Sequence, residues 1–163
     1  MQLVLRPMTK KADFNAEEWS LVLEGPPVAG MVVMTAHRGG SIREAISMSK
    51  AYQAAQKEQA AELVQEIVSA RPEFDRNRYK TPEELRERGL TRIREAVNLL
   101  EGKATPEEVS EYKQFILDVA NTVANAKKEG GVLGIGGKPV SEEEKRAIDE
   151  IAQTLDTAPP ASP

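Results

Sequence analysis

The sequence predicts an all-α protein of six to seven helices, and two observations support this fold class. A Ser or Thr followed three residues later by Glu occurs four times, each time just before apolar residues with helical spacing. In this capping box the hydroxyl accepts from the N–H of the Glu, whose carboxylate accepts from the N–H of the Ser or Thr. In addition, no apolar run has a partner with which it could pair as a strand. The four boxes are Ser41/Glu44, Thr81/Glu84, Thr105/Glu108 and Ser141/Glu144.

The first part of the chain predicts a short helix followed by a buried one. Asn15 can cap a short helix that includes Trp19, and Pro26 and Pro27 then open the segment 28–37. This segment is apolar nearly all round, and its small residues allow close approach of neighbours, as a central buried helix requires. A pair of valines within it could also form a strand, but no partner strand is available. We therefore expect a helix at the centre of the fold.

The rest of the chain predicts helices with one apolar face each. Between residues 41 and 70 the pattern fits either one long helix or two helices that divide near residues 56–59. Pro82 and Pro106 stand at the first helical position, where a missing N–H has no cost. Three further segments repeat apolar residues at steps of three and four, namely 81–101, 105–127 and 141–155.

The length of 163 residues fits one domain, which we place at residues 13–156. Residues 1–12 are predicted to be a loose extension, since Met8 offers a second start. Residues 157–163 are rich in proline and have nothing to bury, so we expect a disordered tail. The first residues are too short an apolar run for a signal or a membrane span, and we expect a cytoplasmic protein without a membrane span.

The composition excludes several kinds of site. The chain has no Cys, which excludes disulfides, thiolate metal sites and cysteine nucleophiles. A single His, His37, excludes a three-histidine zinc site, and we expect it to make a helix-end contact. Asp and Glu number 26 against 22 Lys and Arg, and no basic block is present, so we expect no nucleic acid partner.

Two joints between predicted helices share one pattern. An apolar helix, a pair of glycines and then a hydrophobe beside a capping box occur at residues 35–44 and again at 126–144, where a Gly-rich insert is added. A glycine can adopt the positive φ that ends a helix. The pattern predicts two pseudo-repeated helical hairpin units around the buried central helix.

These joints resemble those of the tellurite-resistance TerB-like family. There an apolar helix ends in Ala-x-x-Asp-Gly, and a hydrophobe and a Glu open the next helix. The resemblance covers most of residues 14–155 and implies an all-helical fold and a role in a stress response. The sequence departs from the pattern at Arg38, which replaces the acidic residue, and in the longer second joint. The similar stretches are Ala36-His-Arg-Gly-Gly-Ser-Ile42-Arg-Glu44 and Glu129-Gly130 with Val140, Ser141 and Glu144.

The resemblance also implies a divalent-cation site. Glu44, Glu129 and Glu144 would converge if the two hairpins pack pseudo-symmetrically, and carboxylates suit Ca²⁺ or Mg²⁺. The alternative is structural, because Glu44 and Glu144 are also the capping-box residues of their helices.

Two other stretches are candidates for anion binding. The loop 130–139 is rich in glycine, but Val132 stands where a phosphate-binding loop needs its first Gly and Pro139 replaces the hydroxyl residue. We expect this loop to pack on the helices or to dock a partner. Residues 71–94 interleave arginines with acidic residues, which is typical of an ion-paired face. An anion pocket would require Arg78, Arg86 and Arg92 to converge.

The sequence therefore predicts a non-catalytic accessory or interaction module of a tellurite-resistance-like stress response, with a protein as its partner. We predict no catalytic residue and no bound cofactor. One alternative is a divalent-cation-binding protein that uses carboxylates at the two helix joints. The other is a small-molecule enzyme of unknown reaction, for example through a carboxylate pair such as Asp118 with Glu44.

Overall fold

The computed structural model describes residues 9–36, 42–57, 62–70, 75–129 and 140–156, apart from the side chains of 42–47, 76 and 127–129. All regular structure in these ranges is helical, which confirms the predicted all-α fold. Two helices, not one, are described between residues 41 and 70. The α-helices are α1 (Ala16–Ala36), α2 (Ile42–Lys57), α3 (Glu62–Ser69), α4 (Pro82–Lys103), α5 (Pro106–Glu129) and α6 (Glu142–Leu155), and the short 3-10 helices are η1 (Lys11–Asp13) and η2 (Arg76–Arg78).

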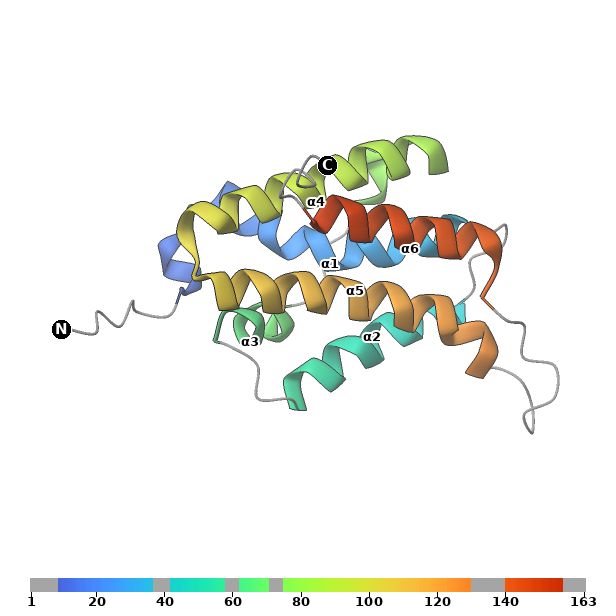
Figure 1. The fold of residues 1–163 in the computed structure, drawn as a ribbon, viewed down its shortest axis with the longest axis horizontal. Coiled ribbons are helices and arrows are strands. Elements are labelled where there is room, and N and C mark those ends of the chain that lie inside the picture. Colours follow the sequence, from blue (N-terminus) through green and yellow to red (C-terminus); the bar gives the residue numbers. More distant parts are fainter. Residues whose placement is uncertain (1–8, 37–41, 58–61, 71–74, 130–139, 157–163) are drawn as a thin grey trace, which may run out of the picture.

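Helix α1 is the centre of the fold, as predicted. Helices α4, α5 and α6 pack on it, and α2 and α3 pack on α5 (Figure 1). Helices α5 and α6 are in contact, as a hairpin requires, whereas α2 packs mainly on α5 and only slightly on α1. The pseudo-repeat of two hairpin units stays a prediction.

The capping residues predicted from the sequence begin α4, α5 and α6. Both hydrogen bonds of the box are formed in α5 and α6. In α4, the Thr81 hydroxyl accepts from the Glu84 N–H at 3.0 Å, but the Glu84 carboxylate accepts from the N–H of Lys80. The predicted box Ser41/Glu44 lies outside the fully described residues.

Helix α1 runs without a break through Pro26 and Pro27, and the prediction of two separate elements here is wrong. Because Pro26 has no N–H, the Val22 carbonyl loses the donor that a helix supplies four residues on. The Tyr112 hydroxyl of α5 donates to this carbonyl at 2.7 Å. Gly25 makes room for it, since a Cβ there would overlap the hydroxyl. A hydrogen bond from α5 thus compensates for the proline.

By length and composition, α1 is the one helix in the described ranges that could cross a membrane. However, 72% of its most apolar stretch is buried inside the protein, and a core helix passes the same test. Its apolar character is accounted for by its contacts with α4, α5 and α6.

The described fold begins at Thr9, four residues before the predicted domain boundary. Thr9 is buried, and both its N–H and its hydroxyl bond the carboxylate of Glu108 at 3.1 Å. Residues 9–12 are therefore attached to the domain, although they were predicted to belong to a loose extension. Residues 1–8 and the predicted tail 157–163 lie outside the described residues.

A buried hydroxyl of α2 provides a first stability prediction. The Tyr52 ring packs on Phe115 with 5.0 Å between ring centroids, and its hydroxyl has no hydrogen-bond partner in the described part of the chain. Replacing Tyr52 with Phe is expected to raise the free energy of unfolding by about 1 kcal/mol, because an unpaired buried polar group is removed. Urea unfolding followed by circular dichroism measures the change.

The matched control is Tyr112→Phe, in which the lost hydroxyl does have a partner. This substitution leaves the Val22 carbonyl without a donor, and we expect it to lower the free energy of unfolding by about 1–2 kcal/mol. Changes of the same sign in the two variants would contradict the assignment of one bonded and one unbonded hydroxyl.

Candidate functional site

The structure describes one of the three predicted metal ligands in full. Glu144 is only 1% exposed, and its carboxylate accepts from the N–H and the hydroxyl of Ser141 at 3.2 and 2.9 Å. Glu44 lies in α2 and Glu129 ends α5, but their side chains are outside the described part. Among the described residues, no group of three or more His, Asp or Glu side chains could hold a metal ion. The Ca²⁺ or Mg²⁺ site stays a prediction.

Three other sequence features lie outside the described residues. These are His37, residues 37–41 of the first joint and the Gly-rich loop at 130–139 of the second. The glycine pairs of both joints that carry the family resemblance therefore lie outside the described residues.

The arginine-rich segment forms an ion-paired network instead of an anion pocket. Arg78 and Arg92 converge on Glu24 of α1, with four nitrogen-to-oxygen distances of 2.9–3.1 Å. The Glu24 side chain is 10% exposed. Arg86 does not join them but makes a two-bond ion pair with Glu150 of α6. The three arginines therefore do not converge, and the network links α1 to η2 and α4.

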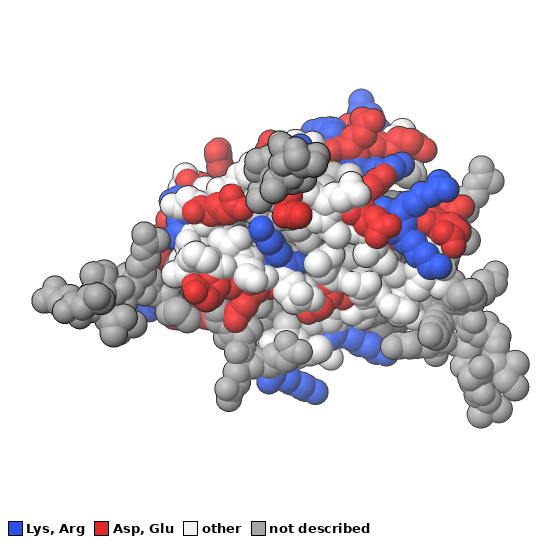
Figure 2. Space-filling view, viewed as in Figure 1, with Lys and Arg blue, Asp and Glu red and all other residues white. Residues whose placement is uncertain are grey.

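The surrounding charges follow the same pattern. Acidic and basic side chains are interspersed on the face shown in Figure 2. Arg88 pairs with Glu84 at 2.6 Å and lies 5.7 Å above the Tyr79 ring. This mixture of signs is typical of a solvated, ion-paired surface, as the sequence indicated.

The environments of several titratable side chains move their pKa values away from neutral pH. A hydrogen bond from Arg88 lowers the pKa of Glu84, and burial raises the pKa values of Tyr52, Tyr79 and Tyr112. At neutral pH the carboxylate is charged and the phenols are neutral. None of these four side chains is therefore poised to exchange a proton near neutral pH.

A hollow of about 730 Å³ lies where α1 begins, between η1, α1 and α3. We call it the Trp19 groove. Trp19 and Phe14 form its base as a ring pair with 5.5 Å between centroids, and Leu23 continues this apolar base. Each of these three residues is less than 10% exposed. Lys10, Lys11 and Glu66 contribute its polar lining.

The Trp19 groove follows from the way α1 starts. Asn15 and Glu18 form a full capping box, with hydrogen bonds of 2.8 and 2.9 Å. Phe14 precedes the cap and Trp19 lies in the first turn after it, so their contact is a hydrophobic staple. Hydrogen bonds from the Asn15 N–H and from the Lys103 side chain lower the pKa of Glu18. The sequence predicts Asn15 as a cap. The staple was not predicted, although the apolar residues Phe14 and Trp19 on either side of the cap are its signal.

The segment before α1, residues 9–14, forms one side of the groove and is held by other elements. Glu66 of α3 accepts from the N–H of Lys11. Lys103 at the end of α4 donates to the Asp13 carbonyl at 2.9 Å and lies 5.5 Å from the Phe14 ring centre. Polar contacts from α3 and α4 therefore fix this side of the groove.

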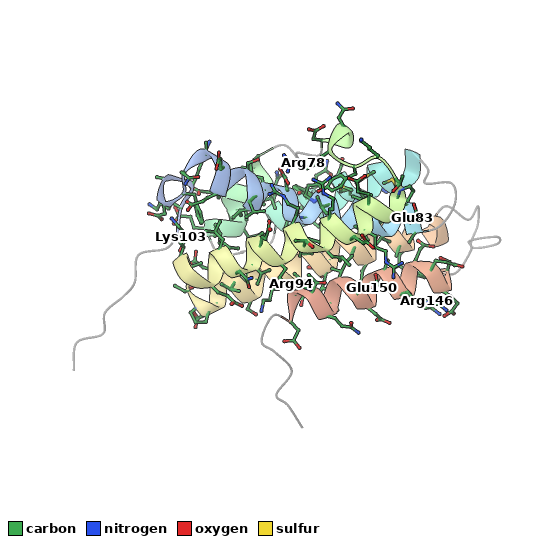
Figure 3. All side chains as sticks on the ribbon, turned by 90° about the horizontal axis from the view of Figure 1, so that it is seen from above. Arg78, Glu83, Arg94, Lys103, Arg146 and Glu150 are labelled. Atoms are coloured by element: carbon green, nitrogen blue, oxygen red, sulfur yellow. The ribbon has the colours of Figure 1, made fainter. Side chains whose placement is uncertain are left out.

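A smaller cleft of about 200 Å³ lies near the starts of α4 and α6. Its polar lining includes Glu83 and Arg146, which lie at the opposite end of the molecule from Lys103 (Figure 3). Positive and negative side chains alternate around it, so it favours no single sign of ligand.

Comparison with protein-family models, curated proteins and solved structures finds no match for this chain. The resemblance to the TerB-like family therefore stays a prediction. A functional assignment rests on the chemistry of the groove.

Proposed function

We propose that this protein is a non-catalytic interaction module that binds a segment of a protein partner in the Trp19 groove. The observation that carries this proposal is the open hollow of about 730 Å³ whose apolar base is an aromatic pair. Aromatic residues in desolvated pockets contribute most of the binding energy of typical protein interfaces. An open groove suits a partner segment better than an enclosed small molecule.

The charges around the groove favour an acidic partner segment. Lys11 is exposed and makes no ion pair in the described part of the chain. Lys10 pairs with Glu62 at 3.6 Å, but both side chains are largely exposed, and such pairs contribute little. Glu66 accepts from the N–H of Lys11 and is one negative charge against the two lysines of the lining. A segment with an apolar anchor and a neighbouring Asp or Glu therefore matches the lining.

The cellular setting rests on the sequence alone. The stress response, the cytoplasmic location and the absence of a nucleic acid partner are proposals that follow from the sequence and from the resemblance of its helix joints to those of the TerB-like family.

The Trp19 groove is separate from the proposed Ca²⁺ or Mg²⁺ site. The groove is lined by residues of η1, α1 and α3, whereas the proposed ligands Glu129 and Glu144 lie at the end of α5 and the start of α6.

A groove-filling variant tests the proposed function. Ala16 lines the groove and is exposed, so Ala16→Phe places a ring in the hollow without disturbing the core. Peptides selected by display on the wild-type protein are expected to carry an aromatic or aliphatic anchor beside Asp or Glu. Their affinity for Ala16→Phe is expected to fall at least about tenfold, because the anchor loses its pocket.

The matched control is Ser110→Phe. Ser110 is also exposed and lines a separate hollow of about 380 Å³ beside Val109 and Lys113. Selected peptides should bind this variant as they bind the wild type. The chain contains a single Trp, so a change in Trp19 emission on binding locates the peptide. Equal affinity for all three proteins would exclude the groove as the binding site.

A further inference from the structure

We infer that Glu108 is a positioning residue for the Trp19 groove, acting through Thr9. This inference rests on the proposed function, because it concerns the shape of the same groove. Glu108 lies in the first turn of α5 and does not line the groove itself. Its effect is to hold the segment 9–14 against the helices.

Glu108 has two structural tasks at once. Its side chain is 1% exposed, and one oxygen accepts from the N–H of Thr105 at 3.2 Å, which caps α5. The same oxygen accepts from the Thr9 hydroxyl, and the other oxygen accepts from the Thr9 N–H, both at 3.1 Å. The buried carboxylate therefore connects the start of the described chain to α5.

This connection fixes one end of the segment that forms a side of the groove. The other end is fixed by the capping box of Asn15 and Glu18. Between these two points lie Lys10, Lys11 and Phe14, which line the hollow. A segment held at both ends is already ordered before the partner arrives, so binding requires less loss of conformational freedom.

Glu144 provides a matched comparison within the same protein. It is also 1% exposed and also closes a capping box, with Ser141 at the start of α6. The starts of α5 and α6 lie at opposite ends of the molecule (Figure 1). A purely structural role for Glu108 predicts equal effects of Glu108→Gln and Glu144→Gln on the groove.

The substitution Glu108→Gln distinguishes the capping hydrogen bond with Thr105 from the hydrogen bonds to Thr9. Glutamine can still close a capping box, because its amide oxygen accepts from Thr105. The other end of the amide is then an NH₂ group that faces the N–H of Thr9, and two donors cannot bond each other. Glu108→Gln therefore weakens the attachment of Thr9 more than the cap.

The experiment measures two properties of the wild type, Glu108→Gln and Glu144→Gln, well below their melting temperatures. The first is the affinity for 8-anilinonaphthalene-1-sulfonate, an apolar anion, followed by energy transfer from Trp19. We expect Glu108→Gln to weaken it about tenfold and Glu144→Gln less than about twofold. The second is hydrogen exchange of residues 9–14, which we expect to accelerate only in Glu108→Gln.

Two variants of Thr9 keep the test decisive if Glu108→Gln unfolds. Thr9→Val removes the hydroxyl and is expected to weaken dye binding about threefold, whereas Thr9→Ser keeps the donor and should restore wild-type affinity. Unchanged exchange of residues 9–14 in Glu108→Gln, or equal effects of Glu144→Gln, would overturn the inference. A dye that binds Ala16→Phe as tightly as the wild type would instead overturn the proposed function, and the exchange readout would still decide the role of Glu108.

Discussion

Replacing Gly25 with Ala is expected to lower the free energy of unfolding by about 3 kcal/mol, because the added Cβ enters a packed region. The Cβ would overlap the Tyr112 hydroxyl. It would also lie 3.1 Å from Cζ of Tyr112 and 3.3 Å from Cδ1 of Ile116. The Tyr112 ring is completely buried, and its hydroxyl is held by the Val22 carbonyl. This strain exceeds the roughly 1 kcal/mol that Ala gains over Gly inside a helix.

Gly102 is the matched control for Gly25. It also lies inside a helix, α4, but a Cβ there would meet nothing within 4 Å. Gly102→Ala is therefore expected to raise stability by up to about 1 kcal/mol through helix propensity alone. Urea unfolding of both variants measures the contrast, and a similar gain in Gly25→Ala would exclude the close approach of Tyr112.

A double-mutant cycle identifies the atom responsible. In the Tyr112→Phe background the overlapping oxygen is absent, so Gly25→Ala should cost at least about 1 kcal/mol less than in the wild type. Additive effects of the two substitutions would show that the hydroxyl is not the obstacle.

The helix starts could be predicted because their signals are local. Thr81, Thr105 and Ser141 each bond an N–H three residues away, within one turn of chain. The continuity of α1 could not be predicted in this way. The donor that compensates for Pro26 is Tyr112, whose hydroxyl bonds a residue 90 positions away. Local rules therefore favoured a break where a distant contact allows the helix to continue.

The Trp19 groove was likewise predictable only where its contacts are local in the sequence. The capping box and the apolar residues around Asn15 are visible in the sequence, so the staple could have been predicted. The attachment of Thr9 could not, because Glu108 lies 99 positions away and already had a local role as a capping residue. The capping role already explained Glu108, and the sequence around it gives no sign of the second set of hydrogen bonds to Thr9.

For the arginine-rich segment, the sequence predicted the pairing but not the partner. Interleaved charges indicated ion pairs near Arg78 and Arg92, yet their shared partner comes from α1, 54 and 68 positions away. Glu24 lies in an otherwise apolar part of the chain. A single acidic residue in such a stretch is a signal for a buried ion pair, since an unpaired charge would not remain there.

Replacing Glu24 with Ala is expected to lower the free energy of unfolding by about 3 kcal/mol, because one buried carboxylate serves two guanidinium groups. Its side chain is 10% exposed, whereas those of Arg78 and Arg92 are 35% and 29% exposed. The arginines can therefore regain some water, which keeps the loss at the lower end of the range for broken buried pairs. Thermal and urea unfolding measure the change.

Glu95→Ala is the matched control, because Glu95 also pairs with Arg92 but at 3.7 Å and with 51% of its side chain exposed. Its removal is expected to change stability by no more than about 0.5 kcal/mol. The Glu24 effect should persist in about 1 M salt, since a buried pair is screened little, whereas any Glu95 effect should vanish. If Glu24→Ala cost as little as Glu95→Ala, the two arginines would be solvated in the folded protein, and apolar packing alone would hold α1 against α4.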